Sequence, residues 1–248
     1  MILVLGHHDD LLVKAVRDRL AGDGTPVLCL DEQEVCSKTS FAFHQSRTRT
    51  DGYLVVDGTR VGLDEISSAL VRLPRMWWPP EELDMQDQMF VYHETSAAWY
   101  AMLASLECPV INRFDLSWWL SDITYPDALV HSLGRRLKVH TRTDPPTDVL
   151  PPRIFPKMPD PACDSVYIAG KRMIPRESTD RETSDWATEH LPAIAEWQRE
   201  NGIGLCRLDF DRENNELHLR HVEIFPVLNE EPDAVVQQIG NATAEMLA

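Results

Sequence analysis

A strand, a helix and a second strand at the start of the chain constrain the fold most. Residues 2–5 are a short apolar run with β-branched side chains, which is typical of a strand buried on both faces of a parallel sheet. Asp9 or Asp10 can cap the helix that follows, and residues 26–30 are a second apolar run. Such a unit of about 30 residues is a βαβ unit, for which parallel pairing is expected. The sequence therefore predicts an α/β fold.

Further elements extend this first domain. Residues 41–56 hold two alternating runs joined near Asp51-Gly52, which predicts a hairpin with its turn at that dipeptide, and Asp57-Gly58 is a second turn signal. Residues 66–73 and 109–111 have the composition of two more buried strands. The remaining element of this part is a long amphipathic helix over residues 82–106.

Polar side chains follow these predicted strands at their carboxyl ends, where open α/β sheets bind ligands. His7 and His8 follow the first strand, so they could hold a metal or a polar ligand, although a helix N-cap with solvated neighbours is the simpler explanation. We expect this edge to line a ligand-binding cleft. Its candidate residues are His7, His8, Arg72, Arg75, Asn112 and Arg113.

A proline-rich junction over residues 144–152 interrupts the second half of the chain, because it can form neither a ladder nor a helix interior. We place the domain boundary earlier, so that residues 1–115 form a parallel α/β domain and residues 116–248 form an α+β lobe. The elements expected in the lobe are helices over 118–133, 185–200 and 233–248, strands over 138–143, 165–169, 172–174, 204–210 and 216–225, and a turn over 211–215.

Composition excludes several classes of function. The chain has 24 basic and 40 acidic residues, and its net charge of −16 would repel nucleic acid and an anionic membrane alike. Its five cysteines are scattered without a Cys-x-x-Cys pair, which favours a reducing compartment. The sequence lacks the features of a signal peptide and has no apolar run of about 18 residues. We therefore expect a cytoplasmic protein that binds neither nucleic acid nor membrane.

Two carboxylates near the end of the chain are the strongest candidates for metal ligands. Asp209 ends one predicted strand, and His221 and Glu223 share one face of the next because strand side chains alternate. Paired carboxylates suit Mg²⁺, which takes a few protein oxygens together with nucleotide phosphates. Solvated acidic residues beside a hairpin are the simpler explanation.

The same residues carry a family resemblance. Residues 204–210 and 219–226 resemble the closing motif of ATP-grasp enzymes, an Asp-Phe strand followed by a strand reading Glu-x-Asn-Pro. The resemblance implies that Asp209 and Glu223 hold the metal ions that bridge ATP phosphates. Phe225 stands where that family has asparagine, so one metal ligand is lost.

The resemblance continues upstream. Residues 164–174 are similar to a segment of ligases that macrocyclise peptides or join amino acids to peptides, in which Asp164 and Gly170 match and Ser165 replaces an arginine. Residues 72–80, 90–94 and 110–113 resemble the pre-ATP-grasp domain of the same ligases. The implied architecture is a pre-ATP-grasp-like α/β domain followed by a shortened ATP-grasp-like lobe, with Asp164 and Arg207 added to the predicted ligand-binding residues.

The chain departs from the family between Thr141 and Asp164. The family has there the strands and the glycine-rich loop that close over ATP, whereas this chain has a short proline-rich stretch without glycine. The sequence therefore predicts a degenerate member that lacks the ATP lid.

Three functions stay open at this level. The first is a protein of peptide or amino-acid tailoring, of the kind that makes ribosomal peptide natural products, that binds a small-molecule or peptide substrate or a partner enzyme. The second is an active carboxylate-amine ligase using Mg²⁺ and ATP, and the third is a cleft reused for an ATP-independent reaction. A missing lid would also expose apolar surface, which a second copy of the chain could cover in a homodimer.

Overall fold

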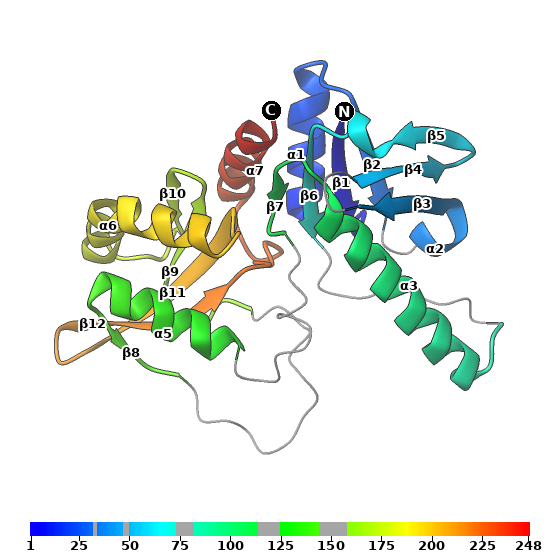
Figure 1. The fold of residues 1–248 in the computed structure, drawn as a ribbon. Helices are drawn as coiled ribbons and strands as arrows, with labels where there is room; N and C mark the ends of the chain where they lie inside the picture. Colours follow the sequence, from blue (N-terminus) through cyan, green and yellow to red (C-terminus); the bar gives the residue numbers. More distant parts are fainter. Residues whose placement is uncertain (32–33, 47–49, 73–81, 114–124, 144–157) are drawn as a thin grey trace. The chain divides into compact units, whose positions relative to one another are not determined.

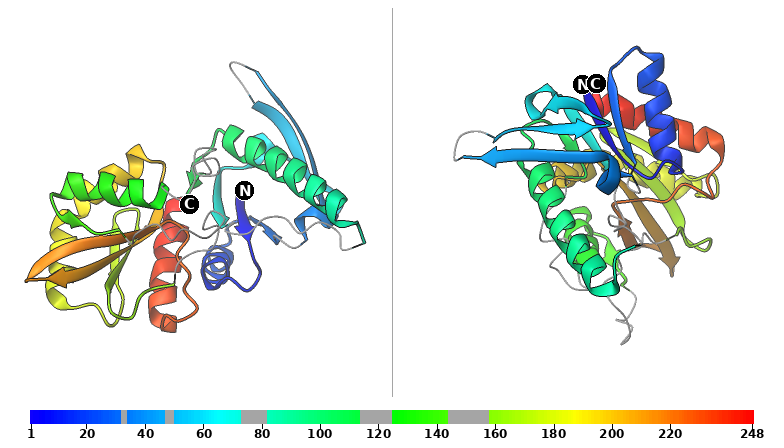
Figure 2. Two further views of the ribbon diagram at one scale, coloured as in Figure 1. Left: turned by 90° about the horizontal axis from the view of Figure 1, so that it is seen from below. Right: turned by 90° about the vertical axis from the view of Figure 1, so that its right-hand side faces the viewer.

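The structure is a computed structural model, and it describes residues 1–31, 34–46, 50–72, 82–113, 125–143 and 158–248. The chain divides into two compact units, each with its own sheet (Figures 1 and 2). The N-terminal unit comprises Met1–Leu116 and Leu247–Ala248, and the C-terminal unit comprises Ser117–Met246. The predicted domain boundary and the proline-rich junction over 144–152 lie outside the described residues.

The N-terminal unit contains the predicted parallel sheet, in the order β2-β1-β6-β7 among its described strands. All three neighbouring pairs are parallel, and the central strand β1 is buried along its whole length, as its apolar composition predicts. The strands are β1 (Ile2–Gly6), β2 (Val27–Asp31), β6 (Ser68–Arg72) and β7 (Val110–Ile111).

Two helices pack on this sheet. Helix α1 (Leu11–Gly22) begins at the predicted cap, where Asp10 Oδ1 accepts hydrogen bonds from the backbone N–H groups of Leu12 and Val13 at 2.8 and 3.2 Å. Helix α3 (Met85–Ser105) contributes Trp99 and Leu103 to the core. Because strand side chains alternate, the sheet face that carries Leu3 and Leu5 packs against α3, and α1 covers the opposite face.

The hairpin region is a three-stranded antiparallel sheet of β3 (Thr39–Gln45), β4 (Thr50–Val56) and β5 (Thr59–Gly62), preceded by the short helix α2 (Val35–Lys38). The turn predicted at Asp57-Gly58 is confirmed, since both residues have positive φ. The turn predicted at Asp51-Gly52 is wrong, because both residues lie inside β4 and Gly52 pairs with Phe43. Glycine is needed there for close backbone approach, because a Cβ would lie 2.5 Å from the carbonyl oxygen of Ala42.

The C-terminal unit is an α+β arrangement around a mixed sheet, in the order β10-β9-β11-β12-β8 among the described strands. β9, β10, β11 and β12 pair antiparallel, and β8 joins β12 in parallel. The elements are α5 (Tyr125–Leu137), β8 (His140–Thr141), β9 (Asp164–Ala169), β10 (Arg172–Pro175), α6 (Arg181–Glu200), β11 (Leu205–Glu213), β12 (Glu216–Glu223) and α7 (Asp233–Leu247).

The two faces of this sheet differ in chemistry. On one face Cys206, Leu208 and Phe210 of β11 form a core with apolar residues of α5 and α6. Alternation places Arg207 and Asp209 of the same strand on the opposite face. Arg207 and Asp209 therefore lie on the sheet face that α5 and α6 do not cover.

The β11–β12 turn is tighter than the predicted turn over 211–215. Asp211 and Arg212 still belong to β11 and pair with His218 and Leu217. Asn214 and Asn215 turn the chain, with φ of 53° and 67°, because asparagine tolerates this left-handed conformation better than most residues.

None of the helices in the described part of the chain is long and apolar enough to cross a membrane. Cys29, Cys108, Cys163 and Cys206 are free thiols. Burial raises the pKa of the Cys206 thiol to about 12, so this thiol is unreactive while the unit is folded.

Gly52→Ala tests the close approach inside β4. We expect a loss of stability of about 1–3 kcal/mol, because the new methyl group would push against the backbone of β3. The matched control is Gly22→Ala, where nothing lies within 4 Å of the position of a Cβ. Urea unfolding should show the control as stable as the wild type or more stable by about 0.5 kcal/mol. An equal loss in both variants would contradict the packing account.

Candidate functional site

A buried ion pair occupies the polar face of the C-terminal sheet. Arg207 Nε lies 2.8 Å from Asp209 Oδ1, and its Nη2 lies 3.1 Å from Asp209 Oδ2, so the contact is bidentate. Arg207 is 0% exposed and Asp209 is 2% exposed. Burial opposes the charge on the guanidinium, but the carboxylates of Asp209 and Glu223 outweigh it and raise the pKa of Arg207 above its usual value.

Neighbouring strands complete the surroundings of this pair. Ser165 of β9 lies opposite Asp209 and donates its hydroxyl to Asp209 Oδ1 at 2.7 Å. Glu223 of β12 lies opposite Arg207 and accepts a hydrogen bond from the backbone N–H of Phe225 at 2.9 Å. The two predicted metal ligands, Asp209 and Glu223, therefore lie on adjacent strands, with Arg207 paired to the first and in register with the second.

A second buried carboxylate belongs to the same unit. Glu231 Oε1 accepts from the Tyr167 hydroxyl at 2.9 Å and lies 3.0 Å from Arg176 Nε. Burial and the charge of Glu231 raise the pKa of Tyr167, so its hydroxyl stays protonated as a donor. No pattern in the sequence singles out Glu231, because it lies in a loop. Alternation could have found Tyr167, which shares a strand face with Ser165.

A Mg²⁺ ion at Asp209 and Glu223 would have to share the Asp209 carboxylate with Arg207. Mg²⁺ needs carboxylate oxygens at about 2.1 Å, whereas both oxygens of Asp209 already accept from Arg207. Repulsion between a guanidinium and a divalent cation about 4 Å apart is on the order of 8 kcal/mol at the effective dielectric constant of about 20 found in proteins. Phe225 also offers no side-chain oxygen at the position of the family's asparagine.

Asp164 lies away from this pair and holds two elements together. Its carboxylate accepts from the backbone N–H of Asp180 at 3.0 Å and from the Thr183 hydroxyl at 2.7 Å. Asp180 caps α6, and its hydrogen bond from the Thr183 backbone is the main cause of its lowered pKa. In this structure the Asp164 side chain fixes the start of β9 to the N-terminus of α6.

The N-terminal unit has its own polar group at the carboxyl edge of its sheet. Asp31, Gly6 and Arg72 end three neighbouring strands in register. Arg72 is 3% exposed and donates from Nε and Nη2 to Asp10 Oδ2 at 3.0 and 2.7 Å. Asp10 thus caps α1 with one oxygen and neutralises Arg72 with the other.

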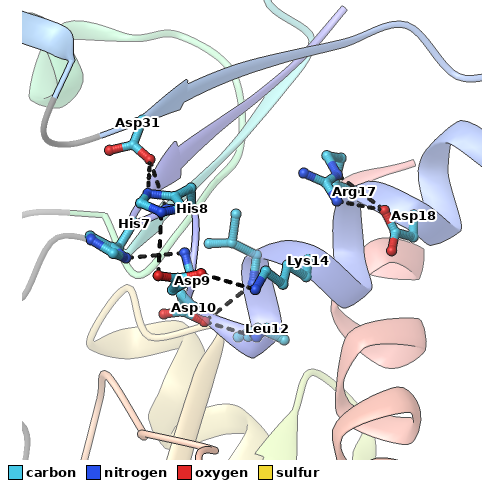
Figure 3. Close-up of polar contacts among 10 residues, drawn as sticks. His7, His8, Asp9, Asp10, Leu12, Lys14, Arg17, Asp18 and Asp31 are labelled. Carbon is cyan, nitrogen blue, oxygen red and sulfur yellow. Dashed lines mark hydrogen bonds and ion pairs between the residues drawn. The ribbon is translucent and has the colours of Figure 1, made fainter.

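His7, His8 and Asp9 form the loop between β1 and α1 (Figure 3). His8 Nδ1 lies 2.7 Å from Asp31 Oδ2, and the same oxygen accepts the backbone N–H of His8 at 2.8 Å. Asp9 carries a lowered pKa, chiefly because Lys14 donates to its Oδ1 at 3.2 Å. The sequence identified both histidines but not Asp31, which is the residue that orients His8.

The remaining predicted residues have different surroundings. Asn112 is fully buried after β7 and has a φ of 55°. Arg113 donates to the carbonyl oxygens of Ala104 at 2.9 Å and Cys108 at 2.7 Å. The C-terminus of α3 carries a partial negative charge, which favours a cation at this position. Arg75 lies outside the described residues.

Solved structures with the same architecture are ATP-grasp enzymes of peptide modification. Macrocyclase MdnC from Microcystis aeruginosa MRC, bound to precursor peptide MdnA, has a TM-score of 0.71 at 13% identity, over 100% of this chain and 99% of that chain. A RiPP-associated ATP-grasp ligase from Chryseobacterium gregarium, in complex with ADP and a leader and core peptide, has a TM-score of 0.69 at 12% identity, over 99% and 96%. Ligase PsnB with a minimal precursor, Mg and ADP has a TM-score of 0.65 at 13% identity, over 100% and 97%.

No family model and no curated protein sequence matches the chain. At identities this low, the structural likeness defines the fold, and the fold of this chain is that of the ATP-grasp ligases. The resemblance found in the sequence and the predicted α/β and α+β architecture are therefore confirmed as statements about fold. The roles of the candidate residues and the absence of a lid stay predictions.

Arg207→Met tests the energetics of the buried pair. We expect a loss of about 3–5 kcal/mol in the free energy of unfolding, because Asp209 would keep a buried charge without its cation. Arg207→Met combined with Asp209→Leu should recover most of the loss, since neither charge then remains. Chemical denaturation measures both.

The control for this pair is Arg181→Met. The Arg181 side chain is 93% exposed and pairs with Asp185 on the surface of α6, so its loss should change stability by less than about 0.5 kcal/mol. A double variant less stable than Arg207→Met would show that the pair does not act as a unit.

Proposed function

We propose that this chain works in peptide or amino-acid tailoring and binds a peptide substrate or a partner enzyme, instead of activating a carboxylate with ATP. In this proposal the chain is a degenerate relative of the ATP-grasp ligases. The observation that carries the proposal is the bidentate contact of Arg207 with Asp209, which places a fixed cation where ligation would require Mg²⁺.

The fold supports the peptide part of the proposal. MdnC is bound to a precursor peptide, and the Chryseobacterium ligase is bound to a leader and a core peptide. A chain with their fold that has lost the metal site can keep a peptide surface, because peptide binding and phosphoryl transfer depend on different groups.

An apolar surface on α3 suits such binding. Met85, Met89 and Phe90 are 72%, 54% and 66% exposed, although large apolar side chains are usually buried. They lie within the first two turns of one helix, where Met85 and Met89 are four residues apart and therefore on the same side. Exposed apolar patches of this kind mark interaction sites.

The location and assembly of the protein belong to the same proposal. Free cysteines and a net charge of −16 support a cytoplasmic protein. A homodimer would cover exposed apolar side chains, and light scattering at two concentrations distinguishes it from a monomer.

The central prediction concerns nucleotide binding. Calorimetric titration with MgATP at millimolar concentration should show no binding to the wild-type chain, because Arg207 occupies the carboxylate of Asp209 and also repels a divalent cation. Conversion of ATP to ADP, measured with a carboxylate and an amine present, should equal the rate in buffer alone.

Asp209→Asn combined with Glu223→Gln is the control for this experiment. If the wild type binds MgATP and this variant does not, the two carboxylates hold the metal and the proposal is wrong. If neither binds, Arg207→Ala should be titrated next, since removal of the cation tests whether the two carboxylates can then take Mg²⁺.

Peptide binding has a separate test. A random peptide library displayed on its encoding nucleic acid should yield sequences that bind the folded chain with micromolar Kd. Met89→Ser combined with Phe90→Ser should weaken them at least tenfold, whereas His93→Ser, at an exposed position of the same helix, should not. A library without any enriched sequence would contradict the peptide part of the proposal.

A further inference from the structure

The loop between β1 and α1 collects three metal-binding side chains that the proposed function does not use. One donor atom from each of His7, His8 and Asp9 lies within 4.8 Å of the others. His8 Nε2 and Asp9 Oδ2 are already 3.3 Å apart. Ligands about 2.0–2.1 Å from a tetrahedral Zn²⁺ are separated by roughly 3.3 Å, so this pair has the spacing that such an ion requires.

The orientation of His8 is fixed from outside the loop. Asp31 is a carboxylate and can only accept, so the 2.7 Å contact places the proton of the imidazole on Nδ1. The lone pair of His8 is therefore on Nε2, the nitrogen that faces Asp9. A carboxylate that holds the second nitrogen of a ligating histidine is the common support of zinc sites.

The other two side chains need only local movement. The rings of His7 and His8 are stacked with centroids 4.4 Å apart, so the His7 ring must turn out of this stack before one of its nitrogens can point to the same ion. His7 Nδ1 accepts the backbone N–H of Asp9 at 3.0 Å, and Lys14 Nζ donates to Asp9 Oδ1 at 3.2 Å. The contact between Lys14 and Asp9 is exposed to water, where an ion pair of this kind is weak.

The donor set selects the kind of ion. Imidazole nitrogens suit Zn²⁺ and similar transition-metal ions, whereas Mg²⁺ prefers oxygen. The carboxylates of Asp9 and Asp31 offset the charge of the ion and the partial positive charge at the N-terminus of α1. Figure 3 shows His8 between Asp31 and Asp9, with His7 beside it.

We propose that His7, His8 and Asp9 bind a divalent transition-metal ion of the Zn²⁺ type, with Asp31 as the positioning residue of His8. Three protein ligands leave one tetrahedral position for water or for an oxygen or sulfur atom of a ligand. The site lies in the N-terminal unit and does not depend on the proposed loss of Mg²⁺ binding in the C-terminal unit.

Calorimetric titration of the full chain with ZnCl₂, after removal of metals by a chelator, tests the site. We expect one ion per chain with micromolar Kd. His8→Ala and Asp9→Asn should each weaken binding at least tenfold, and Asp31→Asn should weaken it about 10- to 100-fold. Lys14→Ala should strengthen binding several-fold, because it removes a cation that competes for Asp9.

His140→Ala is the matched control. His140 is an exposed histidine stacked on His218 with a carboxylate of Glu216 nearby, so it resembles the loop without the convergence of donor atoms. Its variant should bind Zn²⁺ as the wild type does. Wild-type affinity in His8→Ala, or loss of the ion in His140→Ala, would overturn the proposal.

Two spectroscopic measurements separate coordination from a change in folding. Co²⁺ in place of Zn²⁺ should give the wild type a visible tetrahedral absorption band, which His8→Ala abolishes and Asp31→Asn alters. In nitrogen NMR of the wild type, Zn²⁺ should shift His8 Nε2 more than Nδ1. An unshifted His8 at saturating Zn²⁺ would exclude the site whatever the variants do.

Discussion

The buried ion pair between Arg207 and Asp209 is the interaction on which the C-terminal unit depends. Both side chains are almost completely removed from water, where an isolated charge would be very costly. Ser165 adds a hydrogen bond to the same carboxylate, so β9 and β11 are joined through side chains as well as through the backbone ladder. In the function that we propose, the pair also decides the chemistry of the face, because Arg207 takes the carboxylate that a metal would need.

The two units satisfy their polar side chains in different ways. In the C-terminal unit the charges are buried within one sheet face and neutralise one another. In the N-terminal unit Arg72 and Asp10 are paired where the strands end, and His7, His8 and Asp9 remain in the adjoining loop. The second arrangement leaves donor atoms accessible, because side chains beyond a parallel strand lie at the open edge of the sheet.

Most strands and helices could be predicted from periodicity, because an element buried on one or two faces has its apolar residues at a characteristic spacing in the sequence. The turn at Asp51-Gly52 failed for a physical reason. Glycine has two uses, as a turn residue with positive φ and as a strand residue where two backbones approach, and local sequence does not distinguish them. Of the site, Asp209 and Glu223 were found through alternation, whereas Glu231 and Asp31 were missed because their partners are distant in sequence.

The sequence by itself determined the α/β and α+β architecture, the polar face of β11 and β12, and the histidines after β1, since each follows from local pattern. The tertiary structure alone decided what those residues contact. Arg207 and Asp209 are two positions apart on one strand, yet their pairing depends on burial and on Ser165 from β9. The orientation of His8 likewise depends on Asp31, which only the parallel pairing of β1 with β2 brings near. The spacing of residues in the sequence predicts which side chains share a face, and three-dimensional packing decides which atoms are in contact.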